Sequence, residues 1–183
     1  MRSLNHAAAN TTNLREHSEN AMNRSTIALL TFVVQAAACC SALGAPLPHP
    51  SDTSVSLERG PCERRCAVYG VTLYGDGRVV YVGQYFVRKA GTLKARVNPA
   101  AVREIVQQLE ALTFFELKDS YGAEPGDCLE QAEDAPRVTL SLTVEKHRKI
   151  VRHGIGCVGP VTSRLTEIAV AIDRLAGTAQ WTK

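Results

Sequence analysis

The stretch PCERRCAVYGVTLYGDGRVVYVG, residues 61–83, decides the fold because it joins a pair of cysteines to a complete β-hairpin pattern. Cys62 and Cys66 lie four positions apart and lead directly into alternating apolar and polar residues. Such alternation on both sides of Gly75-Asp76-Gly77 is typical of two antiparallel strands and their turn. The stretch therefore predicts strands over 67–74 and 78–82, with a cysteine loop at one end.

The turn between these strands has two interpretations. A two-residue loop, Asp76-Gly77, is typical of a type I′ turn, whereas a three-residue loop from Gly75 places Gly77 in the left-handed conformation. A one-residue shift of register exchanges the two faces of the hairpin. We favour the three-residue loop because it separates two groups of side chains. One face then carries Tyr69, Val71, Leu73, Val79 and Tyr81, and the other carries Thr72, Arg78 and Gln84.

The rest of the chain predicts further strands and two helices. Asn98-Pro99 is a helix start, with asparagine as N-cap and proline at the first helical position. An apolar stripe follows at Val102, Ile105, Val106, Leu109 and Leu112. Pro160 opens a second helix, with Val161, Leu165, Ile168, Ile172 and Leu175 on one side and Gly177 at its end. Strands are predicted over 55–59, 85–88, 92–97, 138–144 and 149–153, the last two joined by 145–148.

This order of strands, helix, two strands and helix predicts an α+β fold. We expect a mostly antiparallel sheet of about 5–6 strands with two helices packed on one face. Phe114, Phe115 and Leu117 are expected to close the core, and Trp181 to pack on the domain and anchor the tail.

The N-terminal part predicts export. Residues 1–21 are polar, and we interpret them as an over-extended gene start with Met22 as the true first residue. The apolar run 27–38 follows Arg24 and is shorter than the about 20 residues that a membrane span needs. Residues 22–45 are therefore predicted to be a signal peptide cleaved after Ala45, with lipidation of Cys39 as the alternative. Residues 46–54 are rich in proline and serine and predict a linker before a single domain over 55–183.

Four cysteines remain beyond the predicted signal: Cys62, Cys66, Cys128 and Cys157. An even number of cysteines in an exported chain predicts disulfides, and four allow three pairings. We favour the nearest-neighbour pairing, Cys62–Cys66 with Cys128–Cys157. The second bond would also hold the long acidic loop over 119–134.

Several runs resemble one exported bacterial family, known as domain of unknown function 6438. They are the runs 58–69 and 74–83 around the cysteine loop and hairpin, FFELKDSY at 114–121, and AGTAQW at 176–181. The resemblance covers about Val55 to Trp181, and Ala67 stands where that family usually has proline. The resemblance implies export and this fold, and it brings no catalytic residues.

The sharpest candidate for chemistry is a copper or redox site at Cys62 and Cys66 with His153. Thiolates and imidazole are ligands that suit Cu(I) and Zn²⁺, and Arg64 and Arg65 would lower the pKa of the thiols. A redox pair normally has two intervening residues and sits at a helix start, whereas these cysteines have three and precede a strand. We therefore favour a structural disulfide here and keep the metal or redox site as the alternative.

Other chemistry has weaker support. The hydrolase candidates Ser141, His49, His147 and His153 occur without a nucleophile, zinc or phosphate-loop motif. The acidic residues Asp119, Asp127, Glu130, Glu133 and Asp134 lack the spacing of an EF-hand. The net charge of +3 gives no nucleic-acid signal, and we interpret the basic cluster Lys146, His147, Arg148, Lys149 and Arg152 as a solvated hairpin tip.

The sequence therefore predicts a non-catalytic module of the periplasm or cell envelope that needs no cofactor. It is expected to bind an envelope partner or ligand by its sheet face or loops, and to meet a membrane only through a lipid anchor.

Overall fold

The computed structural model describes residues 50–63, 65–132 and 135–183. The predicted extension, the signal peptide, Cys39, Ala45 and His49 lie outside these residues, as do Arg64, Glu133 and Asp134. Among the described residues, no helix is long and apolar enough to cross a membrane.

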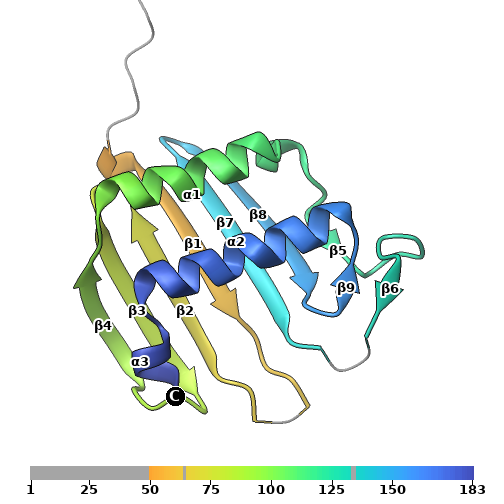
Figure 1. Cartoon of the computed structure of the whole chain (residues 1–183), viewed down its shortest axis with the longest axis horizontal. Helices are drawn as coiled ribbons and strands as arrows, with labels where there is room; N and C mark the ends of the chain where they lie inside the picture. Colours follow the sequence, from red (N-terminus) through yellow and green to blue (C-terminus); the bar gives the residue numbers. More distant parts are fainter. Residues whose placement is uncertain (1–49, 64, 133–134) are drawn as a thin grey trace, which may run out of the picture. The chain divides into compact units, whose positions relative to one another are not determined.

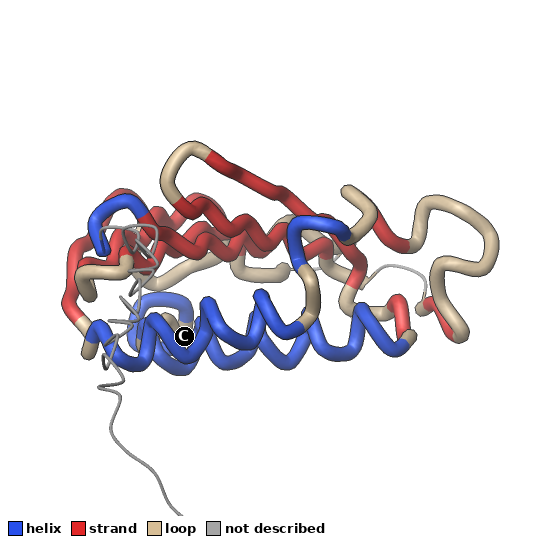
Figure 2. The backbone as a smooth tube through the Cα atoms, turned by 90° about the horizontal axis from the view of Figure 1, so that it is seen from above, coloured by secondary structure: helices blue, strands red, loops and turns tan. Residues whose placement is uncertain are grey.

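The fold is α+β, as predicted, and its helices lie on one face of a large mixed sheet (Figures 1 and 2). The sheet has seven strands in the order β4-β3-β2-β1-β7-β8-β5, and all neighbours are antiparallel except β5 and β8. A second, two-stranded sheet pairs β6 with β9. The strands are β1 Thr53–Arg59, β2 Val68–Tyr74, β3 Arg78–Tyr85, β4 Gly91–Arg96, β5 Ser120–Tyr121, β6 Glu130–Gln131, β7 Arg137–Val144, β8 His147–Gly154 and β9 Cys157–Val158. The α-helices are α1 Pro99–Ala111, α2 Pro160–Ala176 and α3 Ala179–Thr182, and the 3₁₀ turns are η1 Pro50–Asp52 and η2 Phe114–Glu116.

The hairpin of β2 and β3 has the predicted three-residue loop. Leu73 pairs with Val79 and Val71 with Tyr81, and all four side chains are buried. Gly77 adopts a left-handed φ of 84°, and a Cβ there would lie 2.4 Å from the Val97 carbonyl oxygen. The turn therefore needs glycine both for its conformation and for the close approach of the next element.

Both predicted helices are present with their predicted ends. The Asn98 side chain accepts a hydrogen bond from the Ala100 amide at 2.9 Å, and Pro99 opens α1. Gly177 ends α2 with a left-handed φ of 67°. Both helices bury the apolar stripe that their periodicity predicts, against β1, β2 and β7, and Phe114 closes one end of the core.

Four expectations about the strands differ from the structure. The sheet has seven strands rather than five or six, because the loop over 119–134 contributes β5 to it. β1 begins at Thr53, inside the predicted linker, because its backbone pairs from there with both β2 and β7. The separate strand over 85–88 is wrong, since β3 ends at Tyr85 and Phe86 turns the chain with φ 54°. The turn after β7 is tighter than 145–148, because Glu145 takes φ 54° and β8 starts at His147.

A polar network joins the sheet to α2 at the half-buried carboxylate of Asp173. Arg59 of β1 donates two hydrogen bonds to one carboxylate oxygen, at 2.7 and 3.0 Å. The other oxygen accepts from the Tyr69 hydroxyl at 2.8 Å and from Thr178 at 2.9 Å. Burial and the Asp173 charge raise the pKa of Tyr69 to about 12, so the phenol remains a donor. The network therefore fixes the direction of α2 across β1 and β2.

We expect Asp173→Asn to lower the free energy of unfolding by about 2 kcal/mol or more, because Arg59 is then left half-buried without a counter-charge. Urea denaturation of variant and parent measures this difference. The matched control is Glu167→Gln, which removes an exposed ion pair with Arg164 on the same helix. That change should lower stability by less than about 1 kcal/mol, and equal losses in the two variants would contradict a special role for Asp173.

Candidate functional site: the open face of the sheet

The face of the sheet opposite α1 and α2 carries no α-helix among the described residues, and we call it the open face (Figure 2). Side chains alternate between the two faces of a strand, so the neighbours of each core residue point to the open face. The register therefore places Ser56 of β1, Thr72 of β2, Val80 of β3 and Ser141 of β7 there. An antiparallel sheet normally has one packed face and one polar face. A polar face alone is therefore no sign of a binding site, and the charges on the open face have to be considered.

Basic side chains occur toward both edges of the open face. They are Arg78 of β3, Lys94 and Arg96 of β4, Arg137 of β7, and Arg148 and Arg152 of β8. Arg78 forms an ion pair with Asp76 at 2.7 Å and lies over the Tyr74 ring. Within the described ranges, the other five form no ion pair, and the acidic strand residue on this face is Glu58, also without one. The open face is therefore a positively charged surface.

The basic cluster is exposed at Lys146, His147, Arg148 and Arg152, as expected for a solvated hairpin, but it is not confined to the tip. The turn is only Glu145-Lys146, and the remaining residues belong to β8. Alternation sends Arg148 and Arg152 to the open face and Lys149 to the opposite side, where its ammonium binds the Asp119 carboxylate at 2.6 Å. The strand thus divides one basic run between two surfaces.

Two shallow clefts meet on the open face. One, of about 450 Å³, lies over β3 and β4 and is lined by Arg78, Lys94 and Arg96. The other, of about 350 Å³, crosses β1, β2 and β3 and includes the side chain of Arg148 from β8. Val80 lines both clefts, so they lie next to each other. A further cleft of about 390 Å³ lies at the end of β8, near Arg137 and Arg152.

The floor of the second cleft consists of small side chains. The hydroxyls of Ser56 and Thr72 lie 2.9 Å apart, and Gly70 is the glycine in the middle of β2. A Cβ at Gly70 would meet only ordinary contacts, at 3.8 Å from Glu58 and 3.9 Å from the Leu57 oxygen. Neither the backbone nor the packing of the described residues requires glycine there. Glycine inside a strand often marks a place where another molecule approaches closely.

The structure joins the cysteines as Cys62–Cys66 and Cys128–Cys157, with Cα atoms 5.7 and 5.1 Å apart. The first disulfide closes the loop after β1, and Arg65 of this loop lies over the exposed Phe86 ring at 5.6 Å. The second joins the loop before β6 to β9. The first bond closes a loop on itself, and the second connects a loop to the two-stranded sheet. In this state none of the four sulfurs is a thiolate ligand.

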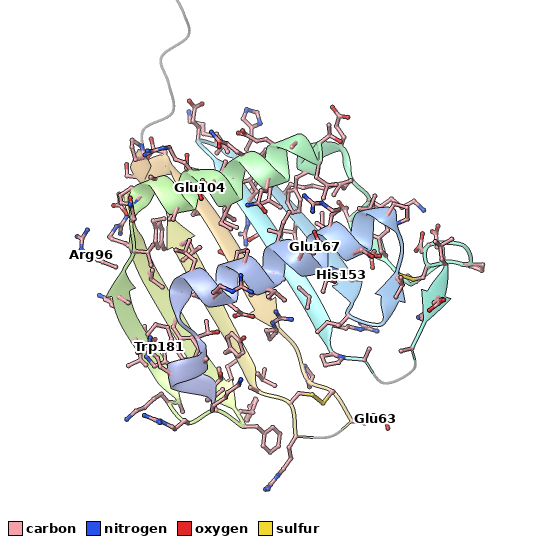
Figure 3. The ribbon with its side chains drawn as sticks, viewed as in Figure 1. Glu63, Arg96, Glu104, His153, Glu167 and Trp181 are labelled. Carbon is pink, nitrogen blue, oxygen red and sulfur yellow. A yellow bond between two sulfur atoms is a disulfide. The ribbon has the colours of Figure 1, made fainter. Side chains whose placement is uncertain are left out.

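His153 lies apart from the Cys62–Cys66 loop, beneath α2 (Figure 3). Its side chain is 2% exposed, and its Nε2 lies 3.1 Å from the Thr166 hydroxyl. Burial, with a smaller effect from Arg59, lowers the pKa of His153 to about 4. Within the described ranges, no group of three or more His, Cys, Asp or Glu side chains is arranged to hold a metal ion. The alternative ligand set Cys62, Cys66 and His153 is therefore not brought together.

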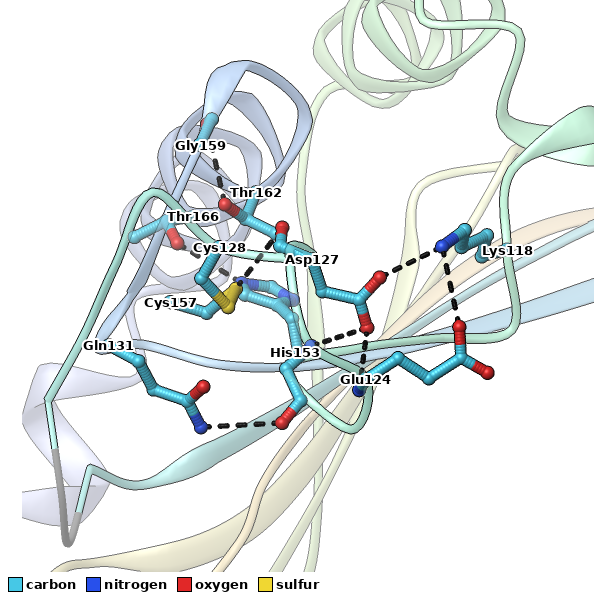
Figure 4. Close-up of a disulfide and its surroundings, with 11 residues drawn as sticks. Lys118, Glu124, Asp127, Cys128, Gln131, His153, Cys157, Gly159, Thr162 and Thr166 are labelled. Carbon is cyan, nitrogen blue, oxygen red and sulfur yellow. Dashed lines mark hydrogen bonds and ion pairs between the residues drawn. A yellow bond between two sulfur atoms is a disulfide. The ribbon is translucent and has the colours of Figure 1, made fainter.

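The carboxylate of Asp127 holds the backbone of the acidic loop in place (Figure 4). Asp127 accepts hydrogen bonds from the amides of Gly122 and Glu124, both at 3.1 Å, and from the Lys118 ammonium at 2.8 Å. The Lys118 contact, followed by the Glu124 amide, lowers the pKa of Asp127. Asp119 is bound to Lys149, and Glu130 lies in β6. Asp119 and Asp127 therefore have structural partners, and Glu130 is exposed.

The other sequence candidates have structural positions. Ser141 is 6% exposed in the middle of β7, and His147 begins β8. Trp181 of α3 stacks on Tyr81 with ring centroids 4.8 Å apart, and its carbonyl accepts from the Lys89 amide. The tail is therefore anchored as expected. The sequence signal for the open face was present in the alternation of Arg78, Lys94 and Arg96 with buried residues, but it indicates a surface only once the strand order is known.

We expect acid to destabilise the domain through His153. In the unfolded chain this histidine takes up a proton near pH 6.5, whereas in the folded chain it does so only near pH 4. The unfolded state therefore binds more protons between these values, and stability falls by up to about 3 kcal/mol as pH drops through the window. Urea denaturation across pH 4–7 should show a shallower fall for His153→Gln than for the parent. Parallel curves would contradict this role.

We expect the exported protein to contain no titratable thiol among Cys62, Cys66, Cys128 and Cys157 before reduction, because all four are in disulfides. A thiol count on the denatured protein, with and without reductant, measures this. A Cu(I) competition assay on the unreduced protein should show no stoichiometric binding. Two free thiols, with Cu(I) binding that Cys62→Ser abolishes, would instead establish the metal site.

The comparisons with known proteins agree with the resemblance seen in the sequence. A comparison with curated proteins finds no match. The family described as "Domain of unknown function (DUF6438)" matches residues 53–176, which run from the first residue of β1 to the last residue of α2. The match covers the cysteine loop, the hairpin and the run FFELKDSY, whereas the run 176–181 lies beyond it except for Ala176. The chain therefore belongs to the DUF6438 family.

Proposed function

We propose that this protein is an exported, non-catalytic binding module of the cell envelope that binds its partner on the open face of the sheet. The single observation that carries the proposal is the open face itself, which is uncovered in the described residues and holds basic side chains without ion-pair partners.

The arrangement of the reactive groups supports binding rather than catalysis. His153 is buried against Thr166, and Asp173 is bound by Arg59, Tyr69 and Thr178. The two disulfides occupy the four cysteines of the domain. These groups hold elements of the fold together, whereas the charged groups of the open face are free to meet a ligand. Export rests on the apolar run 27–38 and on the disulfides, which persist in oxidising compartments.

The opposite surface is less suited to binding. The helices carry both signs of charge on their outer sides, as in the pair Arg164–Glu167. Mixed charges of this kind are typical of a solvated helix face. The partner is therefore expected on the open face, on the side of the sheet away from α1 and α2.

Site-specific photo-crosslinking in cells tests which face is used. Val82 on the open face and Val170 on α2 are a matched pair, because they are the same residue type with 39% and 44% exposure. With a benzophenone amino acid at each position in turn, we expect crosslinked envelope adducts from position 82 and none from position 170. Adducts from position 170 alone, or from neither position, would contradict the proposal.

A further inference from the structure

The two neighbouring clefts of the open face together extend across the strands, and we call them the transverse groove. One end lies over β3 and β4 at Arg78, Lys94 and Arg96, and the other lies at Arg148 of β8. The strand order places four strands, β3, β2, β1 and β7, between β4 and β8. Neighbouring strands are about 4.8 Å apart, so the backbones of β4 and β8 lie roughly 24 Å apart, and Arg148 reaches from β8 to the cleft over β1, β2 and β3.

The first end concentrates like charges. Arg78 and Arg96 are direct cross-strand partners, and Lys94 lies on the same face one pair further along. Like charges directly opposite one another destabilise a sheet. Asp76 binds Arg78 and its charge also attracts Arg96, which offsets part of the repulsion, and among the described residues no carboxylate forms an ion pair with Arg96 or Lys94. A bound anion would relieve this repulsion.

The middle of the groove contains small residues, beside Val80, Val82 and the carboxylate of Glu58. Ser56 and Thr72 supply hydroxyls, and Gly70 lowers the floor without a conformational reason of its own. A chain-like ligand can therefore lie close to the sheet between the two charged ends. The ends supply guanidinium and ammonium donors, which match phosphate and carboxylate oxygens.

Charge complementarity favours an anionic occupant over a second copy of this chain. Two copies placed with their open faces together would bring basic groups against basic groups, which is unfavourable. A neutral ligand would leave the cations at both ends without partners. The carboxylate of Glu58, which also lines the second cleft, would repel an anion that passes near it.

We infer that the transverse groove binds a linear polyanion, carrying phosphate or carboxylate groups, that lies across the strands from Arg96 to Arg148. This inference rests on the proposed function, because it names the chemistry of the partner that the open face binds. The distance between the basic groups at the two ends sets the minimum length of the ligand. The small residues between them allow it to lie close to the sheet.

Fluorescently labelled polyphosphate and polyglutamate test the inference on the disulfide-bonded protein purified from the periplasm of an exporting host. We expect the parent to bind at least one probe, more weakly as salt is raised. Charge reversal at one end by Lys94→Glu/Arg96→Glu, or at the other by Arg148→Glu, should each weaken binding by roughly tenfold or more. Gly70→Val should also weaken it by filling the floor, whereas Glu58→Gln should tighten it. The probe with the higher affinity shows whether phosphate or carboxylate is preferred.

The matched control is Arg103→Glu/Arg174→Glu, which changes the net charge as much as Lys94→Glu/Arg96→Glu but on the exposed sides of α1 and α2. It should keep affinity within about twofold, and thermal melts identify any variant that fails to fold. An equal loss in the control would show that net charge alone drives binding, and a loss confined to one end would exclude a spanning ligand.

The two proposals fail in different ways. If neither probe binds while position 82 still yields crosslinked envelope adducts, the polyanion is wrong and the binding face stands. If the adduct at position 82 is a second copy of this chain, and Gly70→Val lowers the molecular mass in solution, the occupant is a second copy and the polyanion is again wrong. Absence of adducts together with absence of probe binding overturns both.

Discussion

The three-residue turn Gly75–Gly77 is the constraint on which the rest of the structure depends. It pairs Leu73 with Val79, and this register buries one face of the hairpin beneath the helices. A shift of one residue would put Thr72 on the same face as Val79 and Tyr81, and would put Val71 and Leu73 on the same face as Arg78. Because β2 also pairs with β1, and β1 with β7, the same choice of face passes through the middle of the sheet. The turn therefore determines both the core and the open face.

Polar contacts and disulfides then hold α2 and the loops in place around the sheet. Asp173 ties α2 to β1 and β2, so the helix layer has a set position on the buried face. The disulfides act outside the core, where loops are long and make few apolar contacts of their own. Cys128–Cys157 secures the loop that Asp127 organises, and the Cys62–Cys66 loop holds Arg65 over Phe86. These links stabilise the helix-covered face and the loops around the sheet. None of them lies on the open face in the described residues.

Sequence patterns predicted the parts of this fold that depend on neighbours along the chain. The hairpin, the Asn98 cap and the Gly177 stop are local, because each follows from a few adjacent residues and their allowed conformations. The parallel pair β5–β8 and the pair β6–β9 join residues about thirty positions apart, and β5, β6 and β9 have two residues each, which is too short to show a period. The candidate site was missed for the same reason. Arg96 and Arg148 are separated along the chain by α1 and by the strands β5, β6 and β7, and only the strand order places them on one face.

Protection of exposed strand edges offers a competing reason for cations on β4 and β8. Charged side chains on edge strands prevent sheets from pairing with one another, and β4 is an edge strand of this sheet. Edge protection is served by either sign of charge and by side chains on either face. The basic side chains of the transverse groove all lie on the open face, and Arg78 and Arg96 oppose each other directly. Edge protection also gives no reason for Gly70, which lies in the central strand β2, where a larger side chain fits and would strengthen the strand. Binding of an anion across the strands accounts for the charges and the glycine together.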